Sequence, residues 1–170
     1  MPDWLPVRVD PYRLAEKGQT LSGELAVGKM PRLKLLLAGS SGDVECRLVF
    51  SKQVRQYFLT GHIKGCLKLT CQRCLESYDQ EIDSHFSLLL VADDREAERV
   101  QEMAEPLIVV DDELDISTIV EDEILLSMPA IPRHREERDC LSHEMVNEIE
   151  SLPDTQQENP FAVLEKLKKH

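Results

Sequence analysis

Apolar and polar residues alternate along most of the first half of the chain, and this pattern predicts β-strands. The alternation is clearest over residues 43–50, where every second side chain is apolar, as in a strand with one buried face. Further strands are predicted over residues 21–26, 33–38, 54–63, 66–70, 78–91 and 106–110, with a bend or bulge at Gly61. Because these segments follow one another with short connections, they favour an antiparallel meander.

The apolar period changes from two to helical spacing after residue 114. Ile116, Ile119, Val120 and Ile124 recur as on one face of a helix, and Pro129 ends the pattern. Shorter helices are predicted over residues 11–18 and 160–170, and the charged residues 93–105 fit either a helix or a loop. We therefore expect an α+β fold: a mainly antiparallel β-sheet meander, a packed amphipathic helix and a short C-terminal helix.

Length and composition indicate one domain. The 170 residues are 42% hydrophobic, enough for a core. We expect a single α+β domain over residues 1–152, and a polar linker with the short helix over residues 153–170. The chain shows neither an apolar run of about 20 residues nor a secretory signal. We therefore expect a cytoplasmic protein without membrane association.

The net charge of −12 is unevenly distributed. Residues 93–158 contain 21 acidic and 5 basic side chains, whereas residues 1–92 contain 10 acidic and 12 basic ones. The acidic stretch is either a solvated face or a surface for a basic protein, and it would repel a phosphate backbone. Any RNA contact is therefore expected at basic residues of the strand region, unless these are ordinary exposed positions: Arg47, Lys52, Arg55, Lys64, Lys68 and Arg73.

The five cysteines do not suggest a disulfide framework, because their number is odd and the chain is expected in a reducing compartment. Cys71 and Cys74 have the spacing of a zinc-binding turn. Cys140 and His143 repeat that spacing and would complete a structural zinc site, with His134 as an alternative ligand. A redox dithiol and a reduced pair in a turn remain open. The other two cysteines, Cys46 and Cys66, are expected in the core.

Few features of the sequence favour catalysis. The chain has only seven glycines and no phosphate-binding glycine loop, nucleophile elbow or H-E-x-x-H pattern. Adjacent carboxylates occur at residues 121–123, but neighbouring side chains on a helix point in different directions. These three carboxylates are therefore interpreted as a solvated helix face, and no enzymatic activity is expected.

Three segments occur in an order that resembles a known family: LTCQRCLESY at residues 69–78, IVEDEILLSMPAIPRH at 119–134 and NPFAVLEKLKKH at 159–170. Together with the opening of the chain, they are similar to the bacterial YceD family of large ribosomal RNA subunit accumulation proteins. The resemblance implies a role in synthesis, processing or stability of 23S rRNA, without known catalytic activity. It implies the 23S rRNA precursor, a large-subunit ribosomal protein, or both, as partners.

A rival interpretation is a zinc-stabilised or redox-sensitive module that binds a ribosomal protein or another client. The sequence does not decide whether RNA or protein is the direct partner.

Overall fold

The computed structural model describes residues 5–39, 42–102 and 104–140. The strands are β1 (Arg8–Val9), β2 (Thr20–Ala26), β3 (Asp43–Gln53), β4 (Gln56–Thr70), β5 (Ser77–Val91), β6 (Glu105–Ile108) and β7 (Leu114–Asp115). The α-helices are α1 (Pro11–Glu16), α2 (Pro31–Lys34), α3 (Asp94–Val100) and α4 (Ile116–Ser127), with 3-10 turns at Val27–Lys29 and Glu137–Asp139. Residues 153–170 and the expected C-terminal helix lie outside the described residues.

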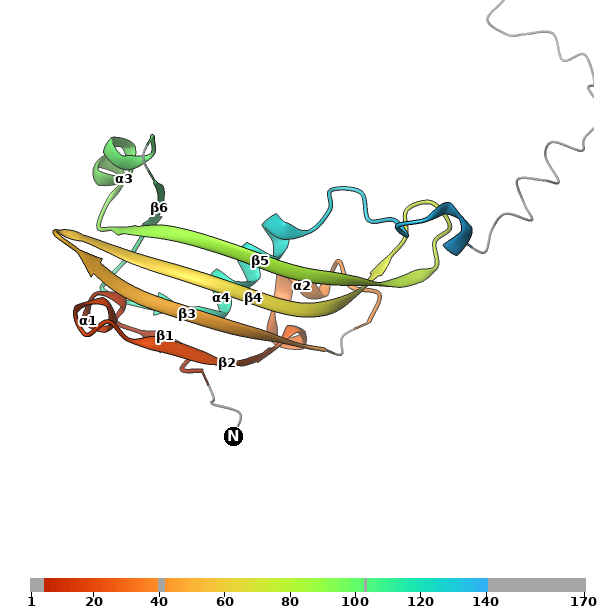
Figure 1. The fold of residues 1–170 in the computed structure, drawn as a ribbon, viewed down its shortest axis with the longest axis horizontal. Helices are drawn as coiled ribbons and strands as arrows, with labels where there is room; N and C mark the ends of the chain where they lie inside the picture. Colours follow the sequence, from red (N-terminus) through yellow and green to blue (C-terminus); the bar gives the residue numbers. More distant parts are fainter. Residues whose placement is uncertain (1–4, 40–41, 103, 141–170) are drawn as a thin grey trace, which may run out of the picture.

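A five-stranded sheet in the order β2-β3-β4-β5-β6 forms the body of the molecule (Figure 1). The first four strands pair antiparallel in sequence order, which confirms the predicted meander. Strand β6 joins the edge of β5 in parallel, because α3 carries the chain back along the sheet. The separate pair of β1 and β7 is antiparallel.

Helix α4 packs on one face of the sheet and forms the core with it. Its buried side chains Ile116, Val120 and Ile124 meet the inward residues of β3 and β4, among them Phe50 and Leu59. The Asp115 carboxylate caps the helix by accepting a hydrogen bond from the backbone N–H of Thr118 at 3.0 Å. The opposite face of the sheet, which we call the outer face, carries mostly exposed polar side chains. The predicted amphipathic helix and its packing are thus confirmed.

The strand predicted over residues 33–38 is wrong. Pro31 begins the short helix α2, and only Leu33 of this leucine run is fully buried. Leu35 and Leu36 are exposed, while Leu37 forms an isolated bridge to β4. The composition of a leucine run is compatible with either a strand or a helix. Here the Glu121 carboxylate of α4 caps the start of α2 and stabilises the helix.

The bend predicted at Gly61 is also absent, because β4 pairs with both neighbours through this position. A glycine at position 61 instead leaves room for the side chain of Phe86. The ring of Phe86, directly opposite on β5, lies over it so closely that a Cβ atom at Gly61 would be 2.0 Å from the ring. Cross-strand packing of an aromatic ring over glycine thus keeps the strand regular.

The carboxylates of residues 121–123 do not form the predicted solvated face. Glu121 is buried, and its Oε1 accepts hydrogen bonds from the backbone N–H groups of Arg32 (2.7 Å) and Leu33 (2.9 Å) at the start of α2. Its Oε2 pairs with the Arg32 guanidinium at 3.0 Å. Glu121 therefore joins α4 to α2, and it takes the place of a local capping residue.

The two buried carboxylates of α4 have opposite electrostatic environments. Burial alone would raise the pKa of Glu121, but the hydrogen bonds from Leu33 and Arg32 hold it below the ordinary value. Burial raises the pKa of Glu123, and the nearby Glu105 and Asp122 raise it further.

Among the described residues, no helix is both long and apolar enough to cross a membrane.

We predict that Glu121→Gln destabilises the fold and that Glu123→Gln does not. At pH 7 the first substitution removes a buried charge that is paired, at a cost of about 2 kcal/mol, or roughly 4–8 °C in the thermal midpoint. The second removes a carboxylate whose ionised form is disfavoured in the folded state, so its midpoint is expected to stay equal or rise.

Thermal melts between pH 7 and pH 3 test the sign of both effects. The pKa of Glu121 is lowered by folding, so the stability it provides is lost as the pH falls through its folded value. The difference between wild type and Glu121→Gln should therefore shrink in acid. Equal losses for both substitutions at pH 7 would contradict this account.

Candidate metal centre and basic surface

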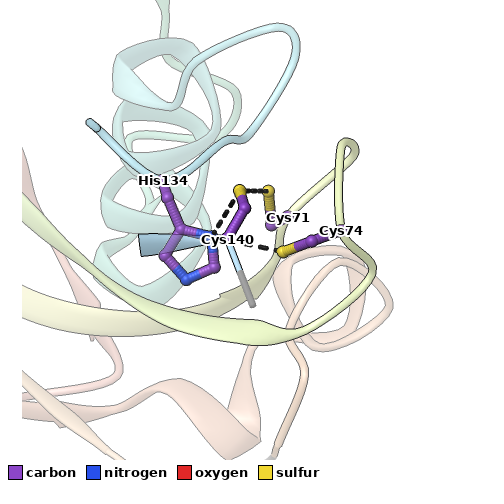
Figure 2. A group of neighbouring side chains, drawn as sticks. All are labelled: Cys71, Cys74, His134 and Cys140. Atoms are coloured by element: carbon purple, nitrogen blue, oxygen red, sulfur yellow. Dashed lines mark hydrogen bonds between the residues drawn. The ribbon is translucent and has the colours of Figure 1, made fainter. Parts of the chain in front are cut away.

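Three cysteines and one histidine meet where the tip of the β4–β5 hairpin contacts the segment after α4 (Figure 2). We call this group the thiol–imidazole cluster: Cys71, Cys74, His134 and Cys140. Every ligand atom in it lies within 4.8 Å of every other. The cluster unites three cysteines from the predicted zinc site with His134, the alternative ligand, whereas His143 lies outside the described residues.

Local backbone structure positions the two hairpin cysteines. Strand β4 ends at Thr70 and β5 begins at Ser77, so both cysteines lie in the connecting turn. The turn is closed by backbone hydrogen bonds from Leu75 to the Cys71 carbonyl and from Cys71 to the Glu76 carbonyl, each 2.9 Å. Leu75 adopts a positive φ of 63°, which turns the chain back and leaves both sulfur atoms on the same side.

The other two ligands come from residues that follow α4. The backbone N–H of Gln72 donates to the Pro132 carbonyl at 2.8 Å, which fixes the segment against the turn. The His134 Nδ1 atom then lies 3.4 Å from Cys74 Sγ and 3.5 Å from Cys140 Sγ. The Sγ atoms of Cys71 and Cys140 are 3.9 Å apart, so the four ligand atoms form one compact group.

Two sulfur atoms of the cluster, those of Cys71 and Cys140, accept hydrogen bonds from Arg73. The Arg73 guanidinium donates from Nε to Cys140 Sγ at 3.0 Å, and the Arg73 backbone N–H donates to Cys71 Sγ at 3.4 Å. Burial of Cys71 opposes ionisation, but hydrogen bonds from the turn and from His134 lower its pKa to about 5. By contrast, burial without such donors raises the pKa of Cys46 to about 11.

The cysteines outside the cluster have different environments. Cys46 is buried in the core, as expected, but Cys66 is exposed, which corrects its assignment to the core. Position 66 has the parity of the outer face of β4, where Lys64 and Lys68 also lie. Alternation alone did not show which face of this short stretch is buried.

A second group of potential ligands lies on the outer face. His62 Nε2 is 2.7 Å from Asp83 Oδ1, and the rings of His62 and His85 stack with centroids 3.8 Å apart. The hydrogen bond with His62 lowers the pKa of Asp83. Because His85 and Asp83 are exposed, water competes for these positions, and the thiol–imidazole cluster is the stronger candidate for a metal.

The six predicted RNA contacts do not form one patch. Arg47, Lys64 and Lys68 share the outer face, but Arg55 and Arg73 lie in turns at opposite ends of β4. A strand of 15 residues separates its ends by about 50 Å. Lys52 lies near the end of β3, at the same end of the sheet as Arg55, and its Nζ pairs with Glu16 at 2.5 Å.

Most of these basic residues have acidic partners. The Nζ atoms of Lys64 and Lys68 lie 3.4 Å from Asp83 and 3.6 Å from Asp79 across the β4–β5 pair. Arg73 binds Glu137 at 3.1 Å in addition to Cys140. Among the described residues, no ion pair is present for Arg47 or Arg55.

A group of arginines that was not predicted as a site lies beside the cluster. Arg133, Arg135 and Arg138 line a cleft together with Tyr78, and this cleft also includes Cys66 of the outer face. The signal was the RHREER run at residues 133–138. The strongly negative net charge of residues 93–158 conceals this local group of arginines.

A family model and a curated relative that match this chain carry the same name. The family model described as "Large ribosomal RNA subunit accumulation protein YceD" matches residues 59–168. A relative from Haemophilus influenzae with the same name is 31% identical over 169 residues, and the match covers 96% of each chain. No solved structure matches the chain significantly.

We predict that Arg73→Gln loosens the segment after α4 without unfolding the sheet. The substitution removes three contacts of the guanidinium, with Cys140 Sγ, the Glu137 carboxylate and the Glu136 carbonyl. Loss of about 1 kcal/mol of local stability would raise the open population about fivefold. Trypsin can report this opening, because Arg133, Arg135 and Arg138 are cleavage sites within the segment.

Limited proteolysis at low protease concentration is the measurement, with cleavage at these three arginines followed by mass spectrometry. Arg55→Gln, in the turn at the other end of the hairpin, is the matched control and should leave the rate unchanged. An unchanged rate in Arg73→Gln would show that these contacts do not hold the segment.

Proposed function

Because the chain belongs to the family of large ribosomal RNA subunit accumulation proteins, we propose that it supports the synthesis, processing or stability of 23S rRNA. It acts in the cytoplasm, by binding the 23S rRNA precursor rather than by catalysis. Family membership over nearly the whole chain carries this proposal. The buried Glu121 supports a non-catalytic role for α4, since this carboxylate is engaged in joining two helices.

The outer face of the sheet is the proposed RNA surface. It is open because α4 and α2 pack on the other side, and it presents Arg47, Lys64 and Lys68. A long, twisted sheet face can follow an RNA backbone, where each phosphate contact releases counterions. The cross-strand ion pairs reduce the positive potential, so the affinity is expected to be modest and steeply dependent on salt.

The acidic part of the chain favours a second candidate function, the binding of a basic ribosomal protein. Its described portion exposes carboxylates in α3 and in the turn at Asp111, Asp112 and Glu113. These groups would attract a cationic partner over a distance of about one Debye length. In that case the effect on 23S rRNA would be indirect.

We predict that the triple substitution Arg47→Gln/Lys64→Gln/Lys68→Gln weakens binding to 23S precursor RNA about tenfold. Each lost phosphate contact should reduce the slope of log affinity against log salt by about 0.7–0.9. Thermal stability should change little, because exposed ion pairs of this kind contribute about 0–1 kcal/mol. The measurements are a salt titration of RNA binding and the ratio of 23S to 16S rRNA in complemented cells.

The matched control is Arg13→Gln/Arg95→Gln/Arg99→Gln, which changes the net charge equally at exposed positions in α1 and α3. Equal losses in both triple variants would indicate non-specific attraction. Unchanged RNA binding in the outer-face variant, together with loss of a co-purifying ribosomal protein when α3 carboxylates are neutralised, would favour the second function. Magnesium-dependent RNA cleavage by the purified protein would contradict a purely binding role.

A further inference from the structure

We propose that one Zn²⁺ ion binds at the thiol–imidazole cluster in a closed tetrahedral site, with four protein ligands: Cys71 Sγ, Cys74 Sγ, His134 Nδ1 and Cys140 Sγ. The ion joins the tip of the β4–β5 hairpin to the segment after α4. The sulfur atoms bind as thiolates, and any proton still on them is released to solvent as the ion binds. This proposal does not depend on which partner the protein has.

The distances agree with this geometry. Zinc bonds of about 2.3 Å to sulfur and about 2.0 Å to nitrogen, at tetrahedral angles, give about 3.8 Å between two sulfurs and about 3.5 Å between sulfur and nitrogen. The structure has 3.9 Å between Cys71 and Cys140, and 3.4 Å and 3.5 Å from His134 Nδ1 to its two sulfur neighbours. A disulfide requires about 2.05 Å, so these sulfurs are spaced as ligands and not as a bonded pair.

The ligand types select the metal. Three soft thiolates and one imidazole in a tetrahedral arrangement are typical of zinc. All four positions are filled by protein side chains, and Cys71 and Cys140 are buried, which leaves no open position for water or substrate. The site is therefore structural and supplies no hydrolytic chemistry.

The surroundings also fit a zinc–thiolate centre. Three thiolates and one Zn²⁺ have a net charge of −1, and the Arg73 guanidinium at 3.0 Å from Cys140 Sγ offsets it. The backbone N–H of Arg73 provides a further hydrogen bond to Cys71 Sγ. Such contacts outside the ligand shell orient the sulfur atoms and stabilise their negative charge.

The segment after α4 has few apolar contacts to hold it in place. Residues 133–140 read RHREERDC, and the 3-10 turn at Glu137–Asp139 has no buried residue. Cys140 is the only residue of this segment that is buried. A segment without apolar anchors is held by polar contacts alone unless a metal adds its binding energy to the folded state.

Zinc analysis of the full-length protein, purified without chelators, tests the proposal. We expect about one zinc per chain, and cobalt substitution should give the absorption of a tetrahedral thiolate site. His134→Ala and Cys140→Ser should each lower zinc affinity at least tenfold in competition with a chromophoric chelator. His85→Ala and Cys66→Ser are the matched controls from the same hairpin and should retain full zinc.

Two further measurements keep the test independent of whether a cysteine variant folds. Removal of zinc from the wild-type protein should speed tryptic cleavage at Arg133, Arg135 and Arg138 several-fold, and zinc addition should restore the original rate. His143→Ala compares the two histidines directly. Zinc loss in His143→Ala with retention in His134→Ala would overturn the ligand set.

Less than about 0.1 zinc per chain, with no cobalt uptake, would overturn the metal site itself. A disulfide between Cys71 and Cys140 in the native protein would do the same. Neither outcome bears on the role in 23S rRNA accumulation, because zinc content is measured on the protein alone.

Discussion

The arrangement of this protein depends on a mismatch of lengths between its main helix and its main hairpin. Helix α4 has 12 residues and spans about 18 Å, whereas β4 and β5 have 15 residues each and span about 50 Å. One helix therefore covers only the middle of the sheet, as Figure 1 shows. Each end of the sheet needs another element, and the two ends are covered in different ways.

At one end the cover is apolar and aromatic. Helix α1 buries Ala15 against the sheet, and the ring of Tyr12 meets that of Tyr57 edge to face, with centroids 5.2 Å apart. At the hairpin tip the covering segment has almost no apolar side chains, so burial cannot hold it. Thiols, an imidazole and an arginine occupy the positions that a hydrophobic layer would otherwise fill. This contrast explains why the cluster lies where it does.

Much of the fold could be predicted from local pattern. The alternation around Val44 to Phe50 and the helical spacing from Ile116 to Ile124 each report which side is buried, since both elements have one buried face. Prediction failed where a distant residue decides the local structure. Residues 31–34 form a helix because Glu121, 89 residues from Arg32, caps it. Gly61 stays in a regular strand because Phe86 lies opposite. Neither contact is visible in a short window of sequence.

The candidate site was predictable where it depends on local spacing and not where it depends on distant contacts. The spacing of Cys71 and Cys74 identifies a turn that can present two sulfurs, and the only cysteine after that pair is Cys140. The choice between two histidines near Cys140 depends on how the chain returns from α4 to the hairpin. That path is set by Pro132, whose carbonyl binds the Gln72 N–H at 2.8 Å, and it brings His134 to the sulfurs.

The course of the chain from α4 back to the hairpin also places three arginines beside the sheet. Arg133, Arg135 and Arg138 flank His134 and line a cleft that reaches Cys66 and Asp79 of the outer face. Three arginines of the acidic stretch thus lie beside the sheet, where Asp79, Glu81 and Asp139 line the same cleft. Because the position of these arginines follows from how His134 and Cys140 are held, the proposed zinc would fix the three arginines beside the sheet. The proposed ion would in this way order a charged surface next to the proposed RNA-binding face.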